Sequence, residues 1–262
     1  MPNIITLTTD FGLSDHFVGT MKGVILGIAP RTQLIDISHA IPPFEIGQGA
    51  FAIAQAYPYF PKGTVHVVVV DPGVGTSRRP ILAEAAGQYF IAPDNGVLSM
   101  VYVRENHRVR AITAQKYFLP EISQTFHGRD VFAPSAAHLA TGVPPARFGK
   151  PIHDYAHLAL AKPQQVARRN WSGTILHIDQ FGNLITNLHI EEFPEVRTRL
   201  FELSVGLEKV RKFAQNFADG SPGELLVIVG SSGYLEVAVN QGSAAKTLGC
   251  GIGSPVEIAF FK

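Results

Sequence analysis

Two expected strands each run directly into an aspartate, and these positions carry the strongest chemical signal in the sequence. The apolar run Val65–Val70 leads into Asp71, and Arg78 follows a short turn that contains two glycines. The first expected strand, Ile4–Thr9, leads in the same way into Asp10. In α/β proteins, ligands bind at the carboxyl ends of the strands. We therefore predict an active site in which both carboxylates and the Arg78 guanidinium hold a small polar ligand.

A further acidic residue, Asp15, lies across a short loop from Asp10. Carboxylates in such a loop can accept hydrogen bonds from a ribose diol or pair with the ammonium group of a ligand. The alternative is structural: Asp15 would cap the helix that follows, and Asp10 would bond to the loop backbone.

His127 differs from the other histidines in its position. It stands in the segment Thr125–Asp130, directly before an expected helix, and its neighbour Gly128 leaves room above the ring. The positive end of the helix dipole disfavours the imidazolium, so this side chain can accept a proton near neutral pH. It could instead serve only to bond the loop backbone.

Two loops in the second half of the chain combine aromatic rings with amide or hydroxyl groups. Ile178–Leu184 contains Phe181 and Asn183, and Val229–Tyr234 contains two adjacent serines. An aromatic face beside polar groups suits a nucleobase, which stacks on the ring and bonds through its edge. We favour Asn183 as a contact because Gly182 clears space beside it, but each loop could also be an ordinary β-turn.

The first half of the chain alternates expected strands with expected helices. This alternation predicts an α/β domain with a largely parallel sheet. Beyond the two strands above, we expect strands at Thr32–Ile37, Ile81–Ala85 and Tyr89–Ala92, and helices at Phe17–Ile28 after Asp15, at Glu45–Tyr57 and from Asp130 to Leu139.

The second half contains short strands separated by turn signals, which predicts a small all-β, barrel-like domain. Between the halves lies a polar stretch rich in proline. We predict an α/β catalytic domain at 1–150, a linker at 151–170 and a substrate-binding domain at 171–262. The expected strands of that domain are Gly173–Ile178, Leu200–Val205, Glu224–Val229, Tyr234–Val239 and Val256–Phe260.

Composition excludes several classes of function. The 262 residues carry a formal net charge of +1, which argues against the basic face that nucleic-acid binding requires. No apolar stretch approaches the ~20 residues of a membrane span. The only cysteine, Cys250, excludes an internal disulfide and a thiolate zinc site, and we expect a cytoplasmic protein.

Taken together, these segments resemble the S-adenosyl-L-methionine hydroxide adenosyltransferase family, which is related to the fluorinating and chlorinating adenosyl enzymes. The resemblance covers nearly the whole chain. Each motif alone is weak, but jointly they are highly specific: Thr9–Gly12 with Asp15, Asp71–Arg78, Ala92–Gly96, Phe126–Asp130, Phe181–Asn183 and Ser231–Tyr234.

The resemblance implies an N-terminal α/β domain, a C-terminal β-barrel, and a homotrimer that binds substrate between neighbouring subunits. In the implied reaction, hydroxide from water replaces methionine at the 5′ carbon of S-adenosyl-L-methionine, which yields adenosine and L-methionine. No cofactor or metal ion is implied.

The same resemblance assigns roles to individual side chains. Its catalytic set falls on Asp71, Arg78 and His127. Its substrate contacts fall on Asp10 for the ribose hydroxyls, on Asp15, Asp179, Ser231 and Ser232 for the methionine end, on Phe44 and Phe181 for the pocket walls, and on Asn183 for the adenosyl portion.

Differences from the halogenating relatives indicate the nucleophile. Those enzymes carry Tyr, Thr and Ser where this chain has Asp71, Arg78 and Gly128, and Arg where it has Ser232. A carboxylate at position 71 would repel a halide, and Gly128 removes a hydroxyl donor. Water or hydroxide is therefore the better nucleophile.

Two other functions fit the same residues. A metal-dependent phosphatase or nucleotidase could hold a divalent ion with Asp10, Asp15, Asp71 and His127, although Arg78 would oppose the cation unless a phosphate intervened. A non-catalytic adenosyl-binding protein could use the same loops. Loss of activity on chelation would favour the first, and tight binding without adenosine release would favour the second.

Overall fold

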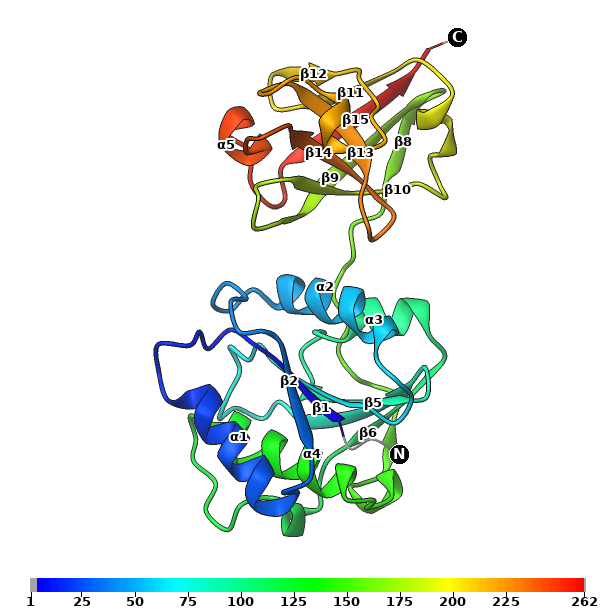
Figure 1. Ribbon diagram of the computed structural model, residues 1–262. Helices are drawn as coiled ribbons and strands as arrows, with labels where there is room; N and C mark the ends of the chain where they lie inside the picture. The colour runs from blue at the N-terminus through cyan, green and yellow to red at the C-terminus, as the bar shows by residue number, and fades with distance from the viewer. Residues whose placement is uncertain (1–3, 262) are drawn as a thin grey trace. The chain divides into compact units, whose positions relative to one another are not determined.

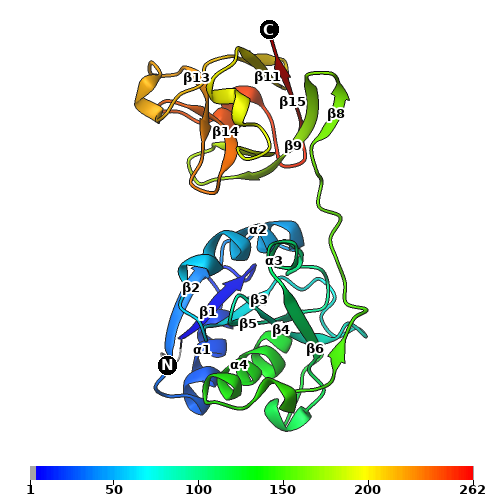
Figure 2. The same ribbon diagram turned by 90° about the vertical axis from the view of Figure 1, so that its right-hand side faces the viewer.

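The computed structural model describes residues 4–261, and the chain divides into two compact units, 1–160 and 161–262. The first unit contains a seven-stranded sheet with helices on both faces (Figure 1). The second contains an eight-stranded, nearly barrel-shaped sheet (Figure 2).

Seven strands form the first sheet: β1 (Ile4–Thr9), β2 (Gln33–Ser38), β3 (Val65–Val69), β4 (Pro80–Ala85), β5 (Gln88–Pro93), β6 (His107–Ala111) and β7 (Pro151–Ile152). Their order across the sheet is β2-β1-β3-β5-β4-β6-β7. All residues of β1 and β3 are buried. Interior strands covered on both faces are rich in apolar residues, which explains why β3 is valine at every position except the buried His66.

Helices cover both faces of this sheet (Figure 1). One face packs against α1 (Phe17–Ile28) and α4 (Ala133–Ala140), and the other against α2 (Ile46–Ala56) and α3 (Ser99–Arg104). The buried residues of α1 recur at helical spacing, so that a single stripe faces the sheet: Val18, Met21 and Ile25.

The first sheet is mixed, so the expectation of a largely parallel sheet was wrong in part. Strands β2, β1, β3 and β5 pair in parallel, whereas β5–β4, β4–β6 and β6–β7 are antiparallel. The cause lies in the connection between β4 and β5, where Ala86 and Gly87 have φ values of 53° and 74°. Two successive residues with positive φ form the tight turn of a β-hairpin, which forces antiparallel pairing.

The expected helices and strands of the first unit all occur, Ile4–Thr9 and Phe17–Ile28 with the expected ends and the others with shifted ends, but the proposed cap at Asp15 is wrong. Helix α1 begins at Phe17 after His16, with no side-chain cap, so Asp15 does not cap it. Asp130 lies inside a π-helical turn, η3 (Gly128–Phe132), which runs directly into α4.

The second unit is antiparallel throughout its ladder. Its elements are β8 (Gln164–Ala167), β9 (Asn170–Ile178), β10 (Leu184–His189), β11 (Phe201–Val205), β12 (Glu208–Val210), β13 (Leu225–Val229), β14 (Tyr234–Val239), α5 (Ala244–Leu248) and β15 (Pro255–Phe260). The order is β12-β11-β15-β9-β10-β14-β13, with β8 on β9, and the end strands β12 and β13 contact each other. Among residues 4–261, no helix is long and apolar enough to cross a membrane.

Candidate active site

The first unit brings Asp10 and Asp71 to one edge of its sheet. Thr9 of β1 pairs with Val69 of β3 in parallel register, so the two strands lead into Asp10 and Asp71 at the same edge of the sheet. Burial raises the pKa of Asp10; the backbone N–H of Phe44 lowers it, and the negative charge of Asp71 raises it further. The two carboxylates therefore share one electrostatic environment, as the sequence predicted.

Asp71, Arg78 and His127 are joined by direct hydrogen bonds. Nε of Arg78 donates to Oδ1 of Asp71 at 2.9 Å, and Nη2 donates to Oδ2. The same Nη2 lies 2.9 Å from Nδ1 of His127. Because a guanidinium can only donate, Nδ1 of His127 is the acceptor, and the proton of the neutral imidazole is on Nε2.

Burial strengthens the electrostatic interactions among Asp71, Arg78 and His127, because little water is present to screen their charges. The side chains of Asp71 and Arg78 are only 4% and 9% exposed. Desolvation lowers the pKa of His127, and the positive charge of Arg78 lowers it further, while Asp71, Asp130 and a backbone hydrogen bond with Ser123 oppose the shift. Neutral His127 is thus the form that fits beside Arg78.

One nitrogen of Arg78 has no hydrogen-bond partner in the described part of the chain. Its Nη1 is buried and makes no hydrogen bond to any residue among 4–261. The guanidinium also lies over the ring of Phe132, with its central carbon 5.1 Å from the ring centroid. An unpaired buried N–H on a charged group costs free energy, so Nη1 is an atom prepared to bind a ligand oxygen or a water.

A tight turn places Arg78 next to His127. Val74 donates its N–H to the Asp71 carbonyl, and Gly75 has a φ of 77°. A Cβ on Gly75 would lie 2.2 Å from the carbonyl oxygen of Gln124. Only glycine lets the turn pack this closely on the chain that leads to His127.

The Ala92–Gly96 motif fixes the other side of this turn. Asp94 accepts bonds from Nε and Nη2 of Arg79 at 2.9 and 2.6 Å, and Asn95 donates to the carbonyl of Val70 at 2.8 Å. Arg79 also donates to Asp154 at 2.9 Å. These contacts are structural and anchor the chain on both sides of the Asp71–Arg78 turn.

One expectation around His127 was wrong, and Asp130 supports the loop that carries this histidine. The space above Gly128 is filled, because a Cβ there would lie 3.1 to 3.2 Å from atoms of Phe126, Met21 and Phe11. Asp130 is fully buried, and it accepts the N–H of Ser123 at 2.8 Å and a hydrogen bond from Arg129. It thereby holds the loop that carries His127.

Phe44 and Asp15 are the remaining predicted contacts of the first unit. Oδ2 of Asp10 accepts the backbone N–H of Phe44 at 3.0 Å, so part of its carboxylate is used by the loop, as the structural alternative proposed. Phe44 has a φ of 70°, and the residue is 70% exposed. Asp15 is exposed on the loop before α1.

In the second unit, Asp179 organises the predicted base-binding loop. Its Oδ1 accepts the backbone N–H groups of Phe181 and Asn183, both at 2.9 Å, and its Oδ2 accepts the Asn183 side-chain amide at 2.8 Å. The expectation that Gly182 clears open space was wrong: a Cβ there would lie 2.0 Å from Oγ of Ser243. The glycine instead permits close docking on the start of α5.

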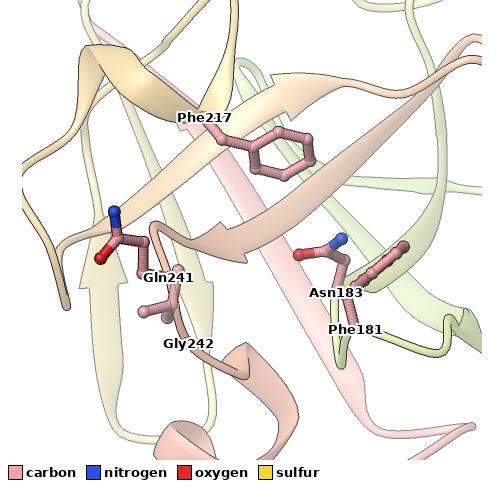
Figure 3. A pocket seen from close by; sticks show the side chains of 6 residues that line it. Phe181, Asn183, Phe217, Gln241 and Gly242 are labelled. Carbon is pink, nitrogen blue, oxygen red and sulfur yellow. The ribbon is translucent and has the colours of Figure 1, made fainter.

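This loop borders a hollow of about 540 Å³, lined by Phe181, Asn183, Phe217, Val239, Gln241 and Gly242 (Figure 3). Phe181 is 78% exposed and Phe217 43% exposed, so both rings offer apolar surface. Since the Asn183 amide nitrogen is bonded to Asp179, its oxygen remains as the acceptor for a ligand. Phe217 and Gln241 were missed by sequence reasoning, because they reach the hollow through the closure of the barrel and not through a local motif.

The second predicted loop of this unit is a hairpin tip between β13 and β14. Gly230 and Gly233 close it through backbone hydrogen bonds, and it presents an exposed Ser231 and a half-buried Ser232. Sequence reasoning missed Glu236, which is buried against this tip: a Cβ on Gly230 would lie 1.6 Å from its Oε1. Desolvation, together with the charge of Asp179, raises the pKa of Glu236 to about 7.

Glu236 is expected to make stability depend on pH. Its pKa is raised in the folded state, so its contribution is complete below about pH 4.5 and is lost as pH rises through about 7. The free energy of unfolding should fall by about 2 kcal/mol over this range. Glu236→Gln should remove most of that slope in thermal melts at a series of pH values, whereas Glu257→Gln, at an exposed site on β15, should leave it. Equal slopes in both variants would contradict this assignment.

The described residues contain no group of three or more His, Cys, Asp or Glu side chains arranged to hold a metal ion. Of the four residues considered for a metal site, Asp71 and His127 are both engaged by Arg78. A cation at that place would be opposed by the guanidinium.

Comparison with known proteins places the chain in one family. The N-terminal domain model of the SAM hydroxide adenosyltransferases matches residues 5–149, and the C-terminal domain model matches residues 173–257. A Thermus thermophilus protein named (R)-S-adenosyl-L-methionine hydrolase is 39% identical, over 95% of this chain and 97% of its own. A protein named fluorinase from Actinoplanes sp. is 31% identical over 92% of each chain.

A solved structure agrees with these matches. The crystal structure of an uncharacterized conserved protein from Thermotoga maritima has a TM-score of 0.92 and 40% identity, and it covers 97% of this chain and 99% of that chain. On the two domain models and the near full-length relatives, the chain belongs to the SAM hydroxide adenosyltransferase family.

Proposed function

We propose that this protein hydrolyses S-adenosyl-L-methionine to adenosine and L-methionine, by attack of a water oxygen on the 5′ carbon. The observation that carries the proposal is the buried Asp71–Arg78–His127 set, in which Nη1 of Arg78 lacks a partner. Relatives named (R)-S-adenosyl-L-methionine hydrolase match nearly the whole chain, which supports the substrate and suggests the (R) configuration at sulfur.

An estimate of the pKa of the bound water indicates that the nucleophile is water, and not a hydroxide ion that is already present in the site. A guanidinium ~4 Å away lowers the energy of hydroxide by about 4 kcal/mol at an effective dielectric of ~20, or about 3 pKa units. A comparable effect from the substrate sulfonium would bring bound water from about 15.7 to about 9 or 10. Hydroxide is therefore a minor species at neutral pH, and water loses its proton as it attacks.

The hydrogen bonds favour Asp71 as the acceptor of that proton. Nδ1 of His127 already accepts a bond from Arg78, and Nε2 carries the ring proton, so neither nitrogen is free to act as a base. Each carboxylate oxygen of Asp71 keeps a second acceptor site. As the C–O bond forms and the C–S bond breaks, the attacking oxygen becomes strongly acidic, and a carboxylate in contact with it can remove its proton.

The geometry of each unit supports part of the proposed set of substrate contacts, and the family resemblance supplies the rest. We assign the adenine to the hollow beside Phe181, with the oxygen of Asn183 as acceptor, and the ribose hydroxyls to the free part of Asp10. The sulfonium already activates the leaving group, so positioning for in-line displacement supplies much of the remaining acceleration. The methionine end is assigned to Asp15, Asp179, Ser231 and Ser232, with Phe44 as a further wall.

The assembly and location are also part of the proposal. The catalytic set belongs to unit 1–160 and the base-binding hollow to unit 161–262. We propose that a homotrimer completes each site between neighbouring subunits, as the family resemblance implies. A single cysteine is in keeping with a reducing cytoplasm.

Hydrolysis in oxygen-18 water tests the reaction directly. The protein, pretreated with EDTA, is incubated separately with the (R) and (S) sulfonium epimers, and the adenosine released is analysed by mass. We expect the label at the 5′ hydroxyl, with the faster release from the (R) epimer. Unlabelled adenosine, or activity that returns only when a divalent ion is restored, would overturn the proposed mechanism. Tight binding without release would indicate a binding protein instead.

A further inference from the structure

A buried histidine next to the catalytic edge is bonded to the strand that carries Asp10. His39 follows β2, and its side chain is 3% exposed. Its Nδ1 lies 2.8 Å from Oγ1 of Thr9, the residue directly before Asp10. Its Nε2 lies 3.0 Å from Oδ1 of Asp36, in an ion-pair contact that is not an aligned hydrogen bond, and the other Asp36 oxygen binds Lys22 at 2.6 Å.

These contacts give the histidine a defined direction of hydrogen bonding. The Asp36 carboxylate favours a proton on Nε2 of His39, which leaves Nδ1 to accept the Thr9 hydroxyl proton. The Thr9 oxygen then remains free to accept the backbone N–H of Phe11 at 3.2 Å. The hydroxyl therefore bridges the histidine ring and the backbone just after Asp10.

The backbone of His39 holds the same loop a second time. Its carbonyl accepts the N–H of Gly12 at 2.8 Å. Farther along the same segment, Phe44 donates its N–H to the Asp10 carboxylate. Residues on both sides of Asp10, and Asp10 itself, are therefore hydrogen-bonded to the segment 39–44.

We infer that His39 is a positioning residue, which sets the orientation of the Asp10 carboxylate through Thr9. This inference rests on the proposed function, in which Asp10 binds the ribose hydroxyls. His39 itself does not touch the substrate. Its removal would leave the Thr9 hydroxyl and the loop backbone free to turn, and Asp10 would lose its fixed direction.

The chain supplies a matched control in the same strand. Oγ1 of Thr6 lies 2.7 Å from Nδ1 of the fully buried His66, whose Nε2 lies 3.1 Å from Oε1 of Gln88. This second Thr–His pair has the same chemistry and burial, but Thr6 lies inside β1 and not at the catalytic edge. A purely structural role predicts the same consequences at both histidines.

The test compares His39→Leu with His66→Leu in the full-length protein, by adenosine affinity and by KM and kcat for S-adenosyl-L-methionine. We expect His39→Leu to weaken adenosine binding and to raise KM, each about tenfold, which corresponds to 1.4 kcal/mol. His66→Leu should change both less than twofold. Should either leucine variant fail to fold, His39→Asn and His66→Asn keep an acceptor for the threonine and serve in its place, with a smaller effect expected at 39.

A double-mutant cycle distinguishes positioning from a general effect on the fold. In an Asp10→Asn background, His39→Leu should change adenosine affinity less than twofold. Additive effects of His39→Leu and Asp10→Asn on adenosine affinity would overturn the inference. Equal losses of affinity in His39→Leu and His66→Leu would also overturn it, as would a wild-type protein that binds no adenosine. If the wild type binds adenosine but hydrolyses nothing, the proposed function fails, and the affinity measurements still decide the role of His39.

Discussion

Replacing Asp71 with asparagine is expected to lower kcat by about 10²- to 10⁴-fold, the range over which a positioned general base contributes. The substitution removes the carboxylate that takes the proton from water and leaves the buried Arg78 without its charged partner. Asparagine has nearly the same shape, so adenosine affinity should change little. Single-turnover hydrolysis and adenosine titration measure the two quantities separately.

Asp94→Asn is the matched control for this substitution. Asp94 also follows a strand of the first sheet, and Nε and Nη2 of Arg79 both donate to its Oδ2. Both variants should lower the melting temperature, because each removes the buried carboxylate of an ion pair. Only Asp71→Asn should lower kcat by the factor given above. Comparable losses of kcat in the two variants would show that ion pairing, and not proton transfer, accounts for the effect.

The activity is expected to decline in acid because His127 must be neutral. Burial and the charge of Arg78 hold its pKa below the usual value of about 6.5, so the neutral form persists to lower pH. Below that pKa, a proton on Nδ1 would face the Nη2 donor of Arg78 and break their hydrogen bond. We expect kcat to be constant from about pH 9 down to 6.5 and to decline only at lower pH. A flat profile would contradict a role for the neutral imidazole.

Two substitutions separate the possible roles of this histidine. In His127→Asn, an amide oxygen can take the place of Nδ1 and accept from Arg78, whereas His127→Ala leaves that donor unpaired. If His127 positions Arg78, the asparagine variant should keep at least tenfold more activity than the alanine variant and lose the decline in acid. If His127 is the base, both variants should be equally inactive.

Much of the candidate site follows from local sequence signals. The run Val65–Val70 predicts a strand that ends just before Asp71. The glycines that follow predict a turn, which brings Arg78 back to the same edge of the sheet. Both outcomes depend on a few adjacent residues, whose backbone preferences are expressed in any fold that contains them. Asp10 could be placed by the same reasoning, because neighbouring parallel strands end together.

Signals of this kind fail where a contact joins distant parts of the chain. His39 and Thr9 are separated by 30 residues, and nothing in the spacing of either indicates that they are bonded. Phe217 and Gln241 reach the base-binding hollow only because the strands of the second unit curve around one core. Glu236 was missed since an alternating strand pattern gives no sign that a carboxylate on the outer face will be covered.

The sequence by itself determined which side chains are available for chemistry and at which strand ends and loops they stand, since apolar periodicity and turn residues act over short distances. The tertiary structure decided the contact of Arg78 with Nδ1 of His127, and it left Nη1 of Arg78 without a partner among residues 4–261. These depend on the angles at which separate elements meet. The free energy that sets those angles comes from packing across the whole unit, and no single segment encodes it.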